Sequence, residues 1–124
     1  MYYLHVRIIA RRTLQRFVEN RIDRKLQHLV KGHLDAWYAE AEKATWRTSA
    51  ELKQQYRSAS IISSERVVFN IKGNEFRLVV AISYQAQVLL ILWLGTHSEY
   101  TKIDAQKVEY DENRYKDSTN SDGR

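Results

Sequence analysis

A histidine, a tyrosine and a lysine lie close together in the segment GTHSEYTKID, residues 95–104, which directly follows an apolar run. Positions where a strand ends and a loop or helix begins are held rigidly and still face solvent, so they commonly carry function. The imidazole of His97 exchanges protons near neutral pH. We therefore interpret this segment as the candidate functional site. The alternative is a solvated polar loop in which Thr96 caps the following turn.

The sequence excludes several other kinds of site. It contains neither the glycine-rich phosphate loops of nucleotide-binding proteins nor the G-x-S-x-G turn of serine hydrolases. It has no cysteine, so disulfides, thiol nucleophiles and cysteine-bound zinc are excluded. His28 and His33 are five residues apart, which is poor spacing for two ligands on one helix face. We therefore expect no metal site and no cofactor.

Positive charge is concentrated in the first third of the chain. The formal net charge is +5, and residues 1–33 alone carry eight Lys or Arg against two Asp or Glu. Such a field favours a polyanion such as RNA, or an acidic protein partner. The alternative is a solvated helix face that keeps the protein soluble.

The spacing of apolar residues predicts a strand and then helices in the first half of the chain. Alternation over residues 2–8 predicts a strand with one buried face. Apolar residues three and four apart over 14–30 predict an amphipathic helix, or two helices in series. Gly32 interrupts this pattern, which then resumes, and a short capped helix is predicted over 48–55.

Three strands are predicted after the helices, and together with the first strand they define the fold class. They cover 67–71, 76–84 and 88–94, with a tight turn at Gly73-Asn74 between the first two. This order predicts an α+β domain, in which an N-terminal strand and helices pack on one face of a mostly antiparallel four-stranded sheet.

The strand over 76–84 has a large-residue face and a small-residue face. We expect the larger side chains, Phe76, Leu78, Val80 and Ile82, to face the helices. The opposite side is mostly small, so we expect an open, concave sheet surface with Arg77 standing in a groove. The residues on that side are Arg77, Val79, Ala81 and Ser83.

The sequence predicts one domain over residues 1–104 and a polar tail over 105–124. The tail shows no core pattern, so we expect it to fray. The longest apolar run, Val88 to Leu94, has seven residues, whereas a helix needs roughly 20 to cross a bilayer. Charges inside the first segment argue against a secretory leader. We therefore expect a cytoplasmic protein that does not associate with a membrane.

Two paired motifs resemble the HigB family of type II toxin–antitoxin toxins. The stretch VVFNIKGNEFRLVV at 67–80 is followed, at the expected distance, by GTHSEY at 95–100. The segments LDAWYAEAEKA at 34–44 and QYRSAS at 55–60 look like the middle section of the same family. The resemblance covers most of residues 2–104.

This resemblance implies a RelE-like fold and cleavage of mRNA in the ribosomal A site. The implied partners are mRNA, the ribosome and a cognate HigA-like antitoxin with a helix-turn-helix domain. Metal-free cleavage of RNA needs few groups. The ribose 2′-hydroxyl attacks the adjacent phosphorus, while a base removes its proton and an acid protonates the departing oxygen. Cations stabilise the added negative charge.

The resemblance also indicates which residues do this chemistry. Arg77 stands where the family motif has arginine, and its guanidinium can hold two phosphate oxygens. The alternative for Arg77 is a surface ion pair with Glu75 or Glu99. His97 and Tyr100 are the candidates for proton transfer or for stacking on a base. Independently of the resemblance, Arg57 and Lys72 are candidates for phosphate contacts because they flank the expected groove, and Lys102 is a further candidate.

Two positions depart from the family pattern. Leu92 stands where the family usually has arginine, and Thr101 stands where it usually has aspartate. Loss of one charged donor from such a site costs roughly a hundredfold or more in rate. A second hypothesis is therefore a catalytically weak or silent module, which keeps the fold and binds an antitoxin, RNA or the ribosome.

Overall fold

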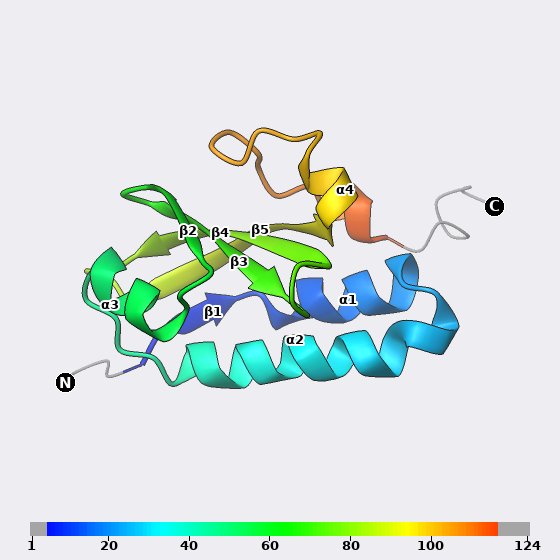
Figure 1. Cartoon of the computed structure of the whole chain (residues 1–124), viewed down its shortest axis with the longest axis horizontal. Coiled ribbons are helices and arrows are strands. Elements are labelled where there is room, and N and C mark those ends of the chain that lie inside the picture. Colours follow the sequence, from blue (N-terminus) through cyan, green and yellow to red (C-terminus); the bar gives the residue numbers. More distant parts are fainter. Residues whose placement is uncertain (1–4, 117–124) are drawn as a thin grey trace.

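A five-stranded sheet with the strand order β1-β5-β4-β3-β2 runs through the centre of the molecule. The computed structural model describes residues 5–116 (Figure 1). The short edge strand β1 pairs with β5 in parallel, and the other neighbouring strands are antiparallel. The strands are β1 (Arg7–Ile9), β2 (Ser60–Ser63), β3 (Arg66–Ile71), β4 (Phe76–Ser83) and β5 (Val88–Thr96).

Two long helices lie side by side along one face of this sheet (Figure 1). The second of them continues through Gly32, so the predicted interruption there is wrong. The glycine faces open space, and one exposed glycine costs a helix only about 1 kcal/mol. The helices are α1 (Arg11–Arg21), α2 (Gln27–Glu42), α3 (Ser49–Gln55) and α4 (His97–Tyr100), with short 3₁₀ turns η1 (Arg24–Leu26) and η2 (Glu112–Tyr115).

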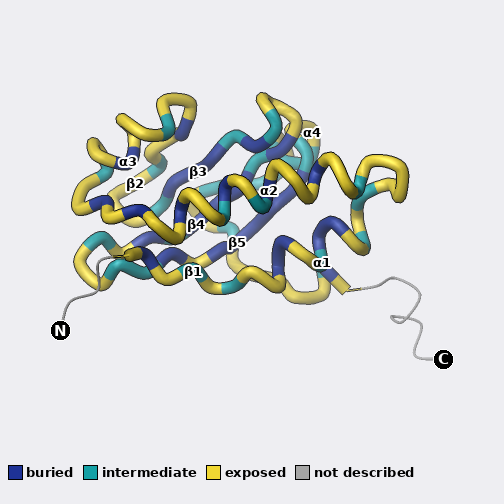
Figure 2. The backbone as a smooth tube through the Cα atoms, turned by 90° about the horizontal axis from the view of Figure 1, so that it is seen from below, coloured by how far each residue is buried: buried dark blue, intermediate teal, exposed yellow. Residues whose placement is uncertain are grey.

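The main core lies between the helices and the sheet. The buried stripes of α1 and α2 face the strands (Figure 2). The ring of Phe17 in α1 packs edge to face against that of Phe76 in β4, with 5.8 Å between the ring centres. The ring centres of Trp37 in α2 and Phe69 in β3 are 5.3 Å apart. The predicted inward face of β4 is confirmed, because its four large residues are all buried in this core.

The α+β class is confirmed, but the strand count is five rather than four. The extra strand, β2, is four residues long with serine at both ends, which is too short and too polar for its period to show in the sequence. Of the strand predicted over 2–8, residues 7 and 8 lie in β1 (Arg7–Ile9), His5 and Val6 precede it outside any strand, and residues 1–4 lie outside the described residues. The short helix predicted near 48–55 is α3, and the Thr48 side chain caps it.

The second face of the sheet is covered, so the prediction of an open, concave surface is wrong for its middle. Val68, Val79 and Trp93 are each at most 4% exposed and form a second apolar cluster. The chain after α4 crosses over this cluster, on the opposite side of the sheet from α1 and α2 (Figure 1). Its apolar residues that pack there include Ile103, Ala105 and Val108.

The chain from residue 101 to 116, here called the C-terminal segment, is tied to the domain by long-range contacts. The Arg66 guanidinium donates to the carbonyls of Ala105 and Val108 at 2.9 and 2.7 Å. Tyr115 is fully buried, and its hydroxyl accepts the Leu94 N–H at 3.0 Å. The structure thus differs from the predicted fraying tail over residues 105–116, and 117–124 lie outside the described residues.

The reason for this difference is that the C-terminal segment is a loop. Its apolar residues occur at irregular spacing, so they show neither the period of a helix nor that of a strand. Their partners are far away in sequence, as in the bond from the Asn20 amide to the Tyr115 carbonyl at 2.8 Å.

We expect Tyr115→Ala to lower the free energy of unfolding by about 3–5 kcal/mol, because it leaves a cavity and an unpaired Leu94 N–H. Urea denaturation of the purified chain measures this change. Tyr110→Ala is the matched control, since Tyr110 is 43% exposed, and it should cost no more than about 1 kcal/mol. A loss for Tyr115→Ala no larger than about 1 kcal/mol would show that the buried Tyr115 ring does not anchor the C-terminal segment to the domain.

Candidate functional site

The candidate site lies at the end of the sheet where the β3–β4 turn meets α4. The turn is tight because Lys72 and Gly73 adopt left-handed backbone angles, with φ of 54° and 64°. The Glu75 carbonyl, at the end of this turn, accepts the His97 N–H at 2.9 Å. The turn and the first residue of α4 are thereby held together.

Arg77 extends from β4 and lies beside Tyr100 of α4. It lies opposite Asn70 of β3 and Gly95 of β5 in the sheet register. Its guanidinium carbon is 5.8 Å from the centre of the Tyr100 ring, within cation–π range. It also donates to the Asn74 carbonyl at 2.9 Å. The structure therefore brings Arg77 and Tyr100 together on one side of the sheet.

Arg77 forms no ion pair within residues 5–116. Glu75 and Glu99, the two carboxylates that could have paired with Arg77, pair with other cations. Glu75 pairs with Lys72 at 2.7 Å. Glu99 pairs with Arg21 and Arg114. Arg77 is half-buried, and within residues 5–116 its guanidinium contacts the neutral carbonyls of Asn74 and Phe76 and the Tyr100 ring face. Such a guanidinium is available to an incoming anion.

His97 is the first residue of α4, and its side chain is exposed. The helix is a single turn that begins with a capping box. The Thr96 hydroxyl accepts the Glu99 N–H at 3.1 Å, and the Glu99 carboxylate accepts the Thr96 N–H at 2.9 Å. These two reciprocal hydrogen bonds fix the backbone of α4, and therefore the positions from which the side chains of His97 and Tyr100 project.

The Glu99 carboxylate joins three parts of the chain. Besides the Thr96 N–H, it accepts hydrogen bonds from Arg21 of α1 at 2.6 Å and from Arg114 of the C-terminal segment at 3.1 Å. Burial alone raises the pKa of the Glu99 carboxyl, but the Thr96 N–H and the charges of Arg114 and Arg21 outweigh that effect. The pKa of Glu99 is therefore lowered, and the carboxylate stays ionised as the link between these segments.

Arg114 is a residue of this region that sequence reasoning missed. Its guanidinium lies 4.6 Å from the Trp93 ring centre and donates to the Leu94 carbonyl at 3.0 Å. Trp93 in turn lies 6.2 Å from Tyr100. The two guanidinium groups of Arg77 and Arg114 thus flank a Trp93–Tyr100 pair.

Gly95 is the residue whose identity could have indicated this arrangement. A Cβ on Gly95 would lie 2.5 Å from the Arg114 guanidinium and 2.7 Å from the Glu99 carboxylate. The glycine is therefore required by close packing and not by a turn. The identity of the group that packs there could not be predicted, because Arg114 is far along an unpatterned loop.

The other three residues predicted to contact RNA come from three different segments of the chain: Lys72, Arg57 and Lys102. Lys72 lies in the β3–β4 turn, with its ammonium bound to Glu75. Arg57 is exposed in the turn after α3, and the carbonyl of its neighbour Ser58 accepts the Asn70 amide at 3.2 Å. Lys102 is exposed just after α4. Their roles remain predictions.

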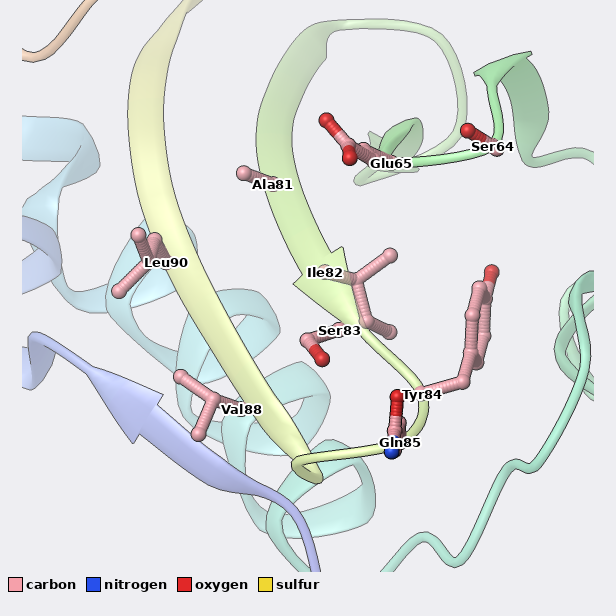
Figure 3. Close-up of a pocket in the computed structure, with 9 residues that line it drawn as sticks. All are labelled: Ser64, Glu65, Ala81, Ile82, Ser83, Tyr84, Gln85, Val88 and Leu90. Carbon is pink, nitrogen blue, oxygen red and sulfur yellow. The ribbon is translucent and has the colours of Figure 1, made fainter.

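A shallow hollow occupies the opposite end of the same sheet face. It measures about 440 Å³, and the small side chains of Ala81 and Ser83 form part of its lining (Figure 3). Leu90 and Val88 of β5 line its other side. The small residues of β4 therefore do leave a hollow, but Arg77 is not among its lining residues.

Two absences apply to the described part of the chain. No group of three or more His, Asp and Glu side chains in residues 5–116 is arranged to hold a metal ion. No helix within these residues combines the length and the apolar character needed to cross a membrane.

The pH dependence of stability tests the role of Glu99. Its pKa is lower in the folded protein than in the unfolded chain. The carboxylate therefore stabilises the fold above the unfolded pKa, and this contribution is lost as the pH falls through the folded pKa. We expect Glu99→Gln to lower the urea midpoint at about pH 7, and the difference from the parent to shrink towards about pH 3.

The control is Glu42→Gln, an exposed carboxylate at the end of α2, which should leave the midpoint unchanged at both pH values. An equal loss for Glu99→Gln at both pH values would show that the ionised carboxylate does not hold α4 in place.

Comparison with known proteins places this chain in a family. The family model for the RelE-like toxic component of a toxin–antitoxin system, the HigB toxin, matches residues 30–103. The match runs from within α2 to just beyond α4, and thus includes Arg77, His97 and Tyr100. No curated protein matches the chain significantly. Because the matched residues make up more than half of the sequence, the chain belongs to the HigB toxin family, the RelE-like toxic components of toxin–antitoxin systems.

Proposed function

We propose that this chain is an endoribonuclease that cuts mRNA in association with the ribosome, without a metal ion. The observation that carries the proposal is the placement of Arg77. Its guanidinium has no carboxylate partner within residues 5–116, and it stands beside Tyr100 of α4, the one-turn helix that begins with His97. A cation next to groups that can move protons is what cleavage of a phosphodiester requires.

In the proposed reaction the ribose 2′-hydroxyl attacks the adjacent phosphorus, and the bond from phosphorus to the 5′-oxygen breaks. One proton leaves the 2′-hydroxyl and one is added to the 5′-oxygen, so the products are a cyclic phosphate and a free 5′-hydroxyl. His97 and Tyr100 are the groups proposed to move these protons. Arg77 stabilises the charge that builds up on the phosphate oxygens.

The proposed partners follow from the family and from charge. A toxin of this family implies an antitoxin partner, and we propose one with a helix-turn-helix domain. Arg57, Lys72 and Lys102 are proposed to contact RNA phosphates around the site. Lys72 would exchange its bond with Glu75 for such a contact. The proposed place of action is the cytoplasm, where mRNA is translated.

Removal of the Arg77 charge tests this proposal. Controlled expression of the parent chain in bacterial cells should stop growth and cut mRNA within translated regions, as read by primer extension. Arg77→Ala should restore growth and lower cleavage roughly a hundredfold or more. Arg47→Ala, which removes an exposed arginine from the loop before α3, should remain toxic.

Circular dichroism and the urea midpoint should show that both variants keep the fold. Full toxicity of folded Arg77→Ala would overturn the assignment of Arg77. A parent chain that neither stops growth nor cuts mRNA would overturn the proposed activity.

A second candidate function is a catalytically weak or silent module that binds an antitoxin, RNA or the ribosome. Two observations favour it: Leu92 occupies the position of a family arginine, and the C-terminal segment covers the middle of the sheet face. Leu92→Arg, with Leu92→Met as a volume control, separates the two candidates. A large gain in cleavage with arginine indicates a decayed site, whereas unchanged cleavage indicates that other cations already serve it.

A further inference from the structure

The edge of β5 carries a second concavity, outside the Arg77 site. β1 pairs with β5 only as far as Leu90, and beyond that residue a pocket of about 470 Å³ lies against the strand. Its walls come from the start of α1, from β5 and from the C-terminal segment. The lining includes Ile9, Arg12, Arg16, Leu90, Leu92 and Tyr110.

Two arginines of α1 give this pocket a positive charge. Arg12 and Arg16 are four residues apart, so they lie on the same face of the helix. Arg12 is exposed and Arg16 half-buried, and neither makes an ion pair or a side-chain hydrogen bond within residues 5–116. Glu112 also lines the pocket, but the Lys116 ammonium lies 3.7 Å from it and offsets its charge.

The same pocket gathers exposed apolar side chains. Ile9, Leu90 and Tyr110 are 45%, 40% and 43% exposed, and they are three of the six large hydrophobic residues that the described chain exposes. The Tyr110 ring stacks on buried Tyr115, with the ring planes 10° apart and the centres 5.9 Å apart. Tyr110 is therefore a fixed ring at the surface, not a mobile side chain.

Leu92 of β5 lines the pocket together with Arg12 and Arg16, and only 6% of its surface is exposed. The pocket therefore combines an apolar strand surface with two guanidinium groups on the neighbouring helix.

We propose that this pocket binds a nucleotide of single-stranded RNA, with its base against Tyr110 and Leu90 and its flanking phosphates at Arg12 and Arg16. The proposal rests on the proposed ribonuclease function and gives it a substrate-holding site. Single-stranded RNA is recognised by stacking of unpaired bases on aromatic rings and by arginine contacts to phosphate. A pocket of this volume is large enough for one nucleotide.

The test measures the binding of a short, fluorescent 2′-O-methyl oligoribonucleotide, which cannot be cleaved by 2′-hydroxyl attack, to the full-length chain. The double variant Arg12→Gln/Arg16→Gln should bind roughly tenfold more weakly. The slope of log affinity against log salt should become shallower by about 1.4, because two phosphate contacts to a single strand are lost. The control Arg24→Gln/Lys25→Gln removes the same charge at η1, beyond the other end of α1, and should bind like the parent.

A second variant tests the base contact without a change in charge. Tyr110→Ala should weaken binding roughly tenfold, and Tyr110→Trp should preserve it, because stacking requires only an aromatic face. Thermal unfolding checks that each variant is folded.

Three outcomes would overturn the inference: unchanged binding by folded Arg12→Gln/Arg16→Gln, equal weakening by the control pair, or displacement of the RNA by poly-glutamate as effectively as by unlabelled RNA. The last result would identify a surface for an acidic protein. These binding results do not depend on catalysis. A chain that binds RNA through this pocket but does not arrest growth would overturn the proposed function alone.

Discussion

The position of α4 depends on one carboxylate. A one-turn helix has too few internal hydrogen bonds to be stable by itself, so its orientation has to be imposed by the rest of the fold. Glu99 imposes it, because its two oxygens bind the backbone of Thr96, the Arg21 guanidinium and the Arg114 guanidinium. A partly buried carboxylate is tolerated only when it is paired in this way. His97 and Tyr100 thus stand on a support built from α1, β5 and the C-terminal segment.

This arrangement makes the C-terminal segment part of the domain. It starts at the site, crosses the second face of the sheet over Val79 and Trp93, and ends with Tyr115 in the main core. The C-terminal segment packs closely against β5 at Gly95, because no side chain fits between that residue and Arg114. Small domains gain stability from any segment that removes apolar surface from water, and here both faces of one sheet are covered.

The sequence predicted features that repeat along the chain or lie close together in it. Apolar periodicity located α1, α2 and the strands β3, β4 and β5, and it predicted which face of β4 points to the helices. The alternative interpretation of residues 95–104, in which Thr96 caps the following turn, located the cap of α4. These signals are local, and local sequence patterns report them well.

The features that the sequence did not reveal depend on contacts between distant residues. Glu99 was weighed as a partner for Arg77, but Arg21 and Arg114 occupy it, and they lie 78 and 15 residues away along the chain. The groove expected beside Arg77 was inferred from small residues on β4 alone. The loop that covers Val79 belongs to a segment without periodicity, so no pattern on β4 indicated its presence.

The covered sheet face limits the path that a bound RNA strand can take. If RNA contacts both Arg77 and the pocket beside Leu92, it cannot cross the middle of the sheet, where Trp93 is buried beneath the C-terminal segment. The same limit holds along β5, because Leu92, Trp93 and Leu94 are each at most 6% exposed, so the RNA has to pass around the C-terminal segment. Leu92 and His97 are five residues apart on an extended backbone, or roughly 17 Å, which a short stretch of RNA spans. Phosphate stabilisation requires a positive charge at the correct place and does not require a particular backbone position. Under the proposals above, Arg12 and Arg16 of α1 hold flanking phosphates in their pocket, and stabilisation of the reacting phosphate falls to Arg77.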